Sequence, residues 1–208
     1  TETIQSNLGV RCVVHKAGRY GFGPNTAGIL DELGYRIDCS VSAAFDLRPY
    51  EGPDYQHFSN RPFWFGNGLL DLPASGAFLR VAPFDLRRRL FAWAARPGLQ
   101  RLRPKGILAR LGLAERVLLS PEGYSFNDLA RLVRAEVRRG ERVLSLTLHS
   151  PSFVPGHTPY VRNDADLSAF LTVLRRLFGY FFGALGGRAS TPFEVAELLR
   201  SPQHSSTP

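Results

Sequence analysis

Three side chains that could do chemistry, His15, Lys16 and Arg19, lie in the segment HKAGRYG. This segment follows the apolar run VRCVV and precedes the helical pattern PNTAGILDELG. In folds built on parallel strands, ligands bind at the carboxyl ends of the strands, so these side chains could reach a ligand. A histidine there could transfer a proton near neutral pH, and the two cations could hold a polar or anionic group. The alternative is an ordinary solvated loop.

The same rule selects polar residues at the ends of the other predicted strands: Asp38 and Ser40, Asp71, Ser120 and Glu122, and His149 and Ser150. His149 ends the apolar run VLSLTL and is the strongest single candidate for a general acid, a general base or a metal ligand. The alternative for His149 is a structural hydrogen bond to a backbone carbonyl at the strand end.

Asp38 has apolar neighbours in the segment GYRIDCS. A carboxylate in such surroundings needs a partner, and Lys16 or Arg19, one strand away, is the expected one. Such a contact could serve a site, or it could be a purely structural ion pair. Cys12 and Cys39 each lie in a predicted strand, so we expect buried free thiols, and a disulfide between neighbouring strands is the alternative. Neither has a partner at metal-ligand spacing, so a structural zinc site is not indicated.

Two common chemical motifs are absent from the sequence. The glycines of GRYGFGPNTAG do not form G-x-x-x-x-G-K-[ST], so they do not indicate a phosphate-binding loop. No G-x-S-x-G occurs either, which argues against a hydrolase with a serine nucleophile on that kind of turn.

The elements that position these residues alternate between strand and helix, as in an α/β fold on parallel strands. Ser125 with Asp128, and Thr191 with Pro192 and Glu194, predict helix N-termini. The expected strands are 10–14, 35–41, 69–73, 115–119 and 142–148, and the expected helices are 24–33, 125–140, 164–185 and one from 192, with interrupted helical pieces between 85 and 111.

We expect one domain over residues 1–200, followed by a disordered tail at 201–208. A partial or distorted (β/α) barrel fits the visible strands, and an open doubly wound sheet is the alternative. The aromatic-rich loop 42–68 is too long for a simple connection, which indicates a functional segment.

Composition limits the function classes. The net charge of +8 comes almost entirely from arginines that alternate with Leu and Ala, which is typical of solvated helix faces, so we expect no nucleic-acid partner. The apolar stretch 167–185 is interrupted by Arg175 and Arg176, so we expect no membrane span. The chain contains no Met and shows no signal peptide, which indicates a processed or truncated product. Its location is left open, with the cytoplasm slightly favoured, and so is its oligomeric state.

Several blocks of the chain, in order, resemble the NodB-like polysaccharide deacetylases, and most closely their WalW-type branch. They are HKAGRYGFG, ILDELGYRIDCSV, RPFW, LLDLP, LSPEGYSFNDLARLVRA and LSLTLHSPSFVPGHTPYVR. The resemblance runs from about Val10 to Arg200 and corresponds to the C-terminal two-thirds of that family. It implies a distorted (β/α) barrel of the polysaccharide deacetylase type, lacking its N-terminal strands. It also implies metal-dependent removal of N- or O-acetyl groups from a glycan.

The resemblance also implies roles for single residues. Lys16 stands where the family has an arginine that orients the catalytic base, and Asp38 would brace that motif. Tyr20 would offer its backbone N–H to the oxyanion. His149 ends the family's Leu-x-Leu-His motif and would protonate the leaving amine. The candidate substrate-binding residues are Arg19, Trp64, His15 and Ser150.

The family's Asp-Asp strand end and His-x-x-x-His pair supply the base and the metal ligands, and neither occurs in this chain. By their order both would lie upstream of Thr1. The resemblance therefore implies a divalent metal, expected to be zinc, in the complete protein, no metal held by this chain alone, and a fragment inactive by itself. The alternative is a non-catalytic glycan-binding or regulatory domain. Lysine at position 16 and the aromatic segment 50–64 favour it, since aromatic faces stack on sugar rings.

Overall fold

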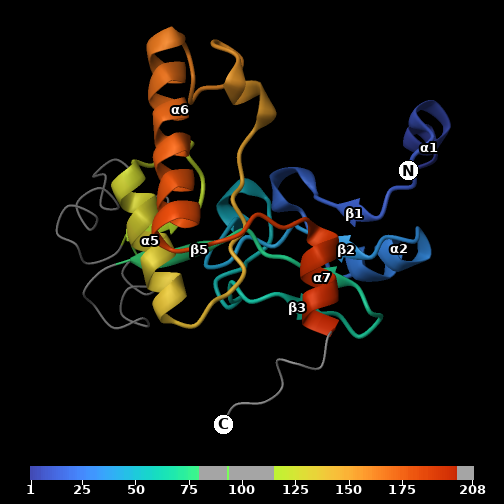
Figure 1. The fold of residues 1–208 in the computed structure, drawn as a ribbon. Coiled ribbons are helices and arrows are strands. Elements are labelled where there is room, and N and C mark those ends of the chain that lie inside the picture. Colours follow the sequence, from blue (N-terminus) through green and yellow to red (C-terminus); the bar gives the residue numbers. More distant parts are fainter. Residues whose placement is uncertain (80–92, 94–114, 201–208) are drawn as a thin grey trace. The chain divides into compact units, whose positions relative to one another are not determined.

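The computed structural model describes residues 1–79, 93 and 115–200, which form a mixed α/β structure with small sheets (Figure 1). The chain divides into two compact units. Unit 1 comprises Thr1–Ala74, Glu141–Ser145 and Gly179–Pro208, and unit 2 comprises Ser75–Gly140 and Leu146–Phe178. The helical pieces predicted between 85 and 111 and the predicted tail at 201–208 lie wholly or almost wholly outside the described residues.

Unit 1 is built on a four-stranded sheet of order β1-β2-β4-β3. Strands β1, β2 and β4 are parallel, β3 is antiparallel to β4, and helix α2 connects β1 to β2, which confirms the predicted βαβ unit. The elements of this unit are α1 Glu2–Leu8, β1 Val14–His15, η1 Gly18–Tyr20, α2 Thr26–Glu32, β2 Ile37–Asp38, η2 Arg48–Tyr50, β3 Phe63–Trp64, β4 Leu70–Asp71, the π-helical turn η5 Gly179–Ala184 and α7 Pro192–Arg200.

The core of unit 1 forms where α7 covers the sheet. Val195 and Ala196 pack on Ile37, Leu70 and Leu72. The start of α7 is the predicted one, because the Glu194 carboxylate accepts the N–H of Thr191 at 2.5 Å and Thr191 Oγ1 accepts the N–H of Glu194 at 3.3 Å. These two bonds satisfy donors that the first helical turn leaves without partners.

The described residues of unit 2 include a two-stranded antiparallel sheet and the helices α5 and α6. Ser125 and Asp128 form the predicted capping box at the start of α5, whose buried face includes Leu129, Leu132 and Val133. Val161, Phe170 and Leu174 form a second cluster with leucines of the segment after α5. The elements among the described residues of this unit are β5 Gly76–Leu79, β6 Glu115–Leu118, α5 Phe126–Arg138, η4 Ser150–Phe153 and α6 Asp164–Phe178.

The strand predicted at 115–119 is present as β6, but its expected place in the parallel sheet is wrong, and so is the strand predicted at 142–148. Strand β6 pairs with β5, which was not predicted, and does not join the parallel sheet. Residues 142–148 form no strand, although Thr147 N–H donates to the Leu119 carbonyl at 3.0 Å. Val143 of this segment packs on the core of unit 1, whereas Leu146 and Leu148 pack on that of unit 2. The apolar pattern of 142–148 therefore indicates buried side chains and does not indicate pairing with a neighbouring strand. Of the five strands predicted to end at one edge of a parallel sheet, β1, β2 and β4 do so.

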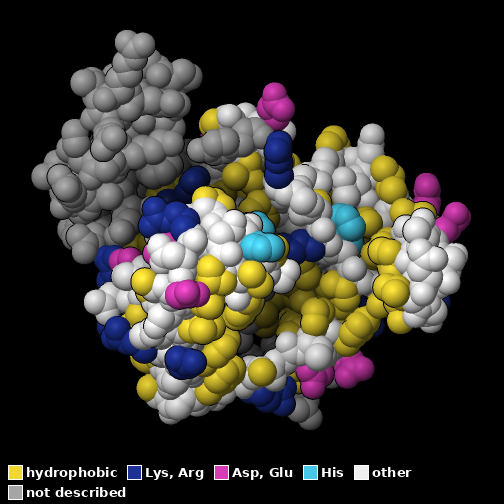
Figure 2. Space-filling view, turned by 90° about the horizontal axis from the view of Figure 1, so that it is seen from above, with side chains coloured by type: hydrophobic (Ala, Val, Ile, Leu, Met, Phe, Trp, Pro, Cys, Tyr) yellow, Lys and Arg dark blue, Asp and Glu magenta, His cyan; other side chains and the backbone are white. Residues whose placement is uncertain are grey.

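Two compositional predictions bear on the surface. By length and composition, Asp164–Ala184 is the one helix of the described chain apolar enough to cross a membrane, and its buried residues are Phe170, Leu174 and Leu177 on one side of α6. On the face shown in Figure 2, Lys and Arg side chains are interspersed with hydrophobic and acidic ones.

Cys12 and Cys39 are free thiols, and both are half-buried, whereas buried thiols were expected.

Candidate functional site

Unit 2 holds His149 against a buried carboxylate. His149 Nδ1 lies 2.8 Å from Glu122 Oε2, and the backbone N–H of His149 donates to Glu122 Oε1 at 2.9 Å. Ser152 Oγ donates to the same Oε1 at 2.5 Å and lies 3.0 Å from Thr158 Oγ1. The Glu122 side chain is 5% exposed, whereas that of His149 is 66% exposed. A buried, well-partnered carboxylate thus fixes an imidazole that solvent and ligands can reach.

This contact determines which nitrogen of His149 can exchange protons. An ionised carboxylate only accepts hydrogen bonds, so Nδ1 carries a proton and Nε2 is left on the open side. The alternative of a backbone carbonyl as ring partner does not occur, since the partner is Glu122. The Tyr160 ring lies parallel to the imidazole, with centroids 6.1 Å apart. Ser150 follows His149 as the exposed first residue of η4.

Unit 1 contains a second pair of this kind, His15 with Asp38. The parallel register of β1 and β2 places the two residues side by side, and His15 Nδ1 lies 2.6 Å from Asp38 Oδ1. Ser40 donates its N–H to Asp38 Oδ2 at 2.7 Å and its hydroxyl to Oδ1 at 2.8 Å. The Asp38 side chain is fully buried, and that of His15 is 26% exposed.

The partner of Asp38 is therefore His15, and the prediction of Lys16 or Arg19 is wrong. Lys16 Nζ donates to the Cys39 carbonyl at 2.9 Å and lies 4.9 Å from the centre of the Tyr20 ring. Burial lowers the pKa of Lys16, against the raising effect of nearby acidic groups. Burial also raises the pKa of the Cys39 thiol to about 11, so this cysteine is a thiol at neutral pH.

A second fully buried carboxyl group, Asp71, lies beside Asp38 on β4. Neither Asp71 oxygen accepts a hydrogen bond from a donor among the described residues. Burial above all, and then the neighbouring Asp38 carboxyl, raise the pKa of Asp71 to about 9. Asp71 therefore holds a proton at neutral pH.

The loop with Arg19 and Tyr20 has strained backbone. Both residues have positive φ, 53° and 56°, a conformation that costs non-glycine residues energy. The buried Tyr55 holds this loop, because its hydroxyl donates to the Tyr20 carbonyl at 2.5 Å and accepts the N–H of Phe22 at 3.2 Å. Burial raises the pKa of Tyr55 to about 12, so this hydroxyl remains a donor. The role of Tyr55 was missed, since nothing local in the sequence distinguishes it from other loop aromatics.

The aromatic side chains of the loop 42–68 contact one another and Phe22. Phe22 stacks on Phe65 with ring centroids 5.1 Å apart, and the ring centroids of Phe58 and Phe63 lie 5.8 Å apart. Trp64 is 38% exposed, but the guanidinium of Arg200 lies 4.8 Å from the centre of its ring. One face of the predicted sugar-stacking tryptophan is thus already covered.

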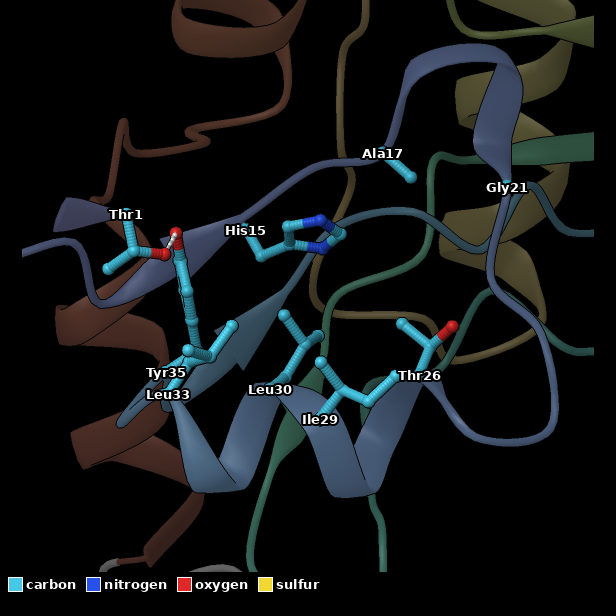
Figure 3. A pocket seen from close by; sticks show the side chains of 9 residues that line it. All are labelled: Thr1, His15, Ala17, Gly21, Thr26, Ile29, Leu30, Leu33 and Tyr35. Atoms are coloured by element: carbon cyan, nitrogen blue, oxygen red, sulfur yellow. Dashed lines mark hydrogen bonds between the residues drawn. The ribbon is translucent and has the colours of Figure 1, made fainter. Parts of the chain in front are cut away.

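A pocket of about 400 Å³ opens beside α2 in unit 1 (Figure 3). Ile29 and Leu30 of α2, with Leu33 directly after it, form an aliphatic wall, and the ring of His15 points into the space opposite them. Tyr35 lies at one end, where its hydroxyl is 3.1 Å from Thr1 Oγ1.

Within the part of the chain that the structure describes, no three His, Cys, Asp or Glu side chains lie together as a metal site requires. These residues do not fit the zinc site that the resemblance implies. Comparison of the chain with family models, curated proteins and solved structures gives no match.

Proposed function

We propose that this chain belongs to a polysaccharide deacetylase of the NodB-like superfamily, on a distorted (β/α) barrel, in which His149 is the general acid. The observation that supports the proposal is the fixed geometry of His149, with Nδ1 on the buried Glu122 carboxylate and Nε2 open to solvent. The resemblance places the same residue at the end of the family's Leu-x-Leu-His motif.

Deacetylation of an amide needs such a group because an amine anion is a poor leaving group. A protonated His149 donates the Nε2 proton to the leaving nitrogen as the C–N bond breaks. The Glu122 carboxylate stabilises the imidazolium before transfer and holds its orientation. General acids of this kind typically contribute about 10²- to 10⁴-fold to a rate. The described residues supply no metal site, so attack on the acetyl carbonyl is not assigned to them.

The test is acetate release from N-acetylated chitin oligosaccharides and from O-acetylated xylan by the protein that carries this chain, with zinc in the buffer. We expect His149→Gln to lower kcat by about 10²-fold or more. His157→Gln is the matched control, since His157 is exposed in the same unit and should leave kcat unchanged. Absence of acetate release from both substrates by the wild-type protein refutes the proposal, and full activity in His149→Gln removes His149 from the mechanism.

One observation favours the alternative of a non-catalytic glycan-binding domain. Lys16, at the position of the family's arginine, donates to a backbone carbonyl and so does not orient a carboxylate base. Saturable binding of the same oligosaccharides without acetate release selects this alternative.

A further inference from the structure

We propose that the pocket beside α2 is a second acid–base site, in which His15 acts as general base on short-chain acyl esters. This site goes beyond the proposed deacetylase and stands independently of it, because every residue that forms it lies in unit 1.

The first support is the state of the His15 ring. Asp38 accepts both donors of Ser40 and the Nδ1–H of His15, so the carboxylate fixes the tautomer with the proton on Nδ1. Nε2 has no partner among the described residues, and the ring lines the pocket (Figure 3). A ring nitrogen without a partner, on an imidazole that lines a pocket and is held by a fully buried carboxylate, is the arrangement of a general base.

The second support is the chemistry of the pocket wall. The aliphatic side chains of Ile29, Leu30 and Leu33 fit an alkyl chain, and about 400 Å³ accommodates a short one. The hydroxyl of Tyr35, paired with that of Thr1, offers one donor for a carbonyl oxygen at the end of the pocket. The ligand class is therefore a short alkyl group attached to a carbonyl.

The donors at the pocket limit the leaving group. The backbone N–H of Ala17 already donates to Ser40 Oγ at 2.8 Å, and that of Gly21 to the Gly18 carbonyl at 3.1 Å. Neither is free to stabilise an oxyanion, so the tetrahedral intermediate has little support beyond a hydroxyl. Esters with good leaving groups, and not amides, are the substrates that such a site can hydrolyse.

Hydrolysis of an ester at His15 takes place in two steps. A water molecule attacks the ester carbonyl carbon, its proton passes to His15 Nε2, and a C–O bond forms while the carbonyl electron pair moves to oxygen. The intermediate collapses, the bond to the leaving alkoxide or phenolate breaks, and a carboxylic acid is released. The proton on Nε2 then returns to the leaving group or to solvent.

The experiment uses the full chain with p-nitrophenyl butyrate at pH 7, in EDTA so that metal-dependent deacetylation does not contribute. We expect saturable release of nitrophenolate, with kcat at least about 10²-fold lower in His15→Gln. Any exposed imidazole gives slow hydrolysis that does not saturate. His157→Gln removes one such imidazole outside the pocket and should therefore match the wild type in kcat. Circular dichroism checks that His15→Gln is folded.

A second measurement does not depend on turnover. Proton–nitrogen NMR of the His15 ring should show the proton on Nδ1, and butyramide, an unreactive analogue, should shift the ring resonances saturably. Unchanged kcat in His15→Gln, a wild-type rate that does not saturate, or ring resonances that butyramide does not shift would each overturn the proposal. Failure of acetate release from glycans would leave it standing.

Discussion

Replacement of Asp71 by Asn tests whether this buried carboxyl is protonated beside Asp38. Both side chains are fully buried on adjacent parallel strands. Asn keeps the shape of a protonated Asp and offers an N–H to the Asp38 carboxylate, but it cannot titrate. The variant therefore removes one proton equilibrium with little change in packing.

The sign and the size of the effect follow from the pKa of Asp71. It is raised from 3.8 to about 9, so between these values the folded protein holds a proton that the unfolded chain has released. The free energy of unfolding then falls as pH rises, by at most about 1.4 kcal/mol per pH unit. Over the two units from pH 5.5 to 7.5, the titration of Asp71 lowers the free energy of unfolding of the wild type by at most about 3 kcal/mol. Asp71→Asn lacks this decrease.

The assay is urea denaturation followed by circular dichroism at several values between pH 5.5 and 7.5. The unfolding free energy of Asp71→Asn minus that of the wild type should increase as pH rises. Asp166→Asn is the control, because hydrogen bonds from Arg162 lower the pKa of Asp166 and place its titration below this range. If the difference for Asp71→Asn is as flat as that for the control, Asp71 is ionised and the reasoning is refuted.

Two further predictions concern local backbone structure. Ser125→Ala removes the side chain that accepts the N–H of Asp128 at the start of α5, so it should lower the free energy of unfolding by about 1 kcal/mol in urea denaturation. Ser125→Asp keeps an acceptor and should lower it less. Equal losses in the two variants would contradict the capping role. Arg19→Gly should stabilise the protein by about 1 kcal/mol, because φ at Arg19 is 53° and glycine adopts this conformation without strain. Gly34→Ala, at a φ of 78°, should destabilise it for the same reason. Thermal melts measure both variants, and a lower melting temperature for Arg19→Gly would contradict the strain at Arg19.

The helix ends could be predicted from the sequence because they depend on neighbours within one turn. Ser125 with Asp128 and Thr191 with Glu194 make the bonds that their spacing indicates. Strands depend on distant partners, so the segment 142–148 reads as a strand and is not one. Apolar alternation reports that side chains are buried, but it does not say which backbone lies alongside.

The sequence indicates candidate residues, but it does not indicate which side chains contact them. Asp38 was expected to contact Lys16 or Arg19, yet the β1–β2 register places His15 beside it. The contact of Glu122 with His149 joins residues 27 positions apart and depends on how the segment after α5 returns to β6. Composition indicates that a buried carboxylate needs a partner, and only the register decides which one it has.

The two histidine–carboxylate pairs are built alike but differ in access, and this difference supports separate substrates. In each pair a serine hydroxyl, that of Ser40 or Ser152, donates to the carboxylate that holds Nδ1. The His149 side chain is 66% exposed, so a polymer chain can reach its Nε2. The His15 side chain is 26% exposed and faces a pocket of about 400 Å³, which admits a short acyl group and not a glycan chain. We therefore propose a glycan as the substrate at His149 and a small ester as the substrate at His15.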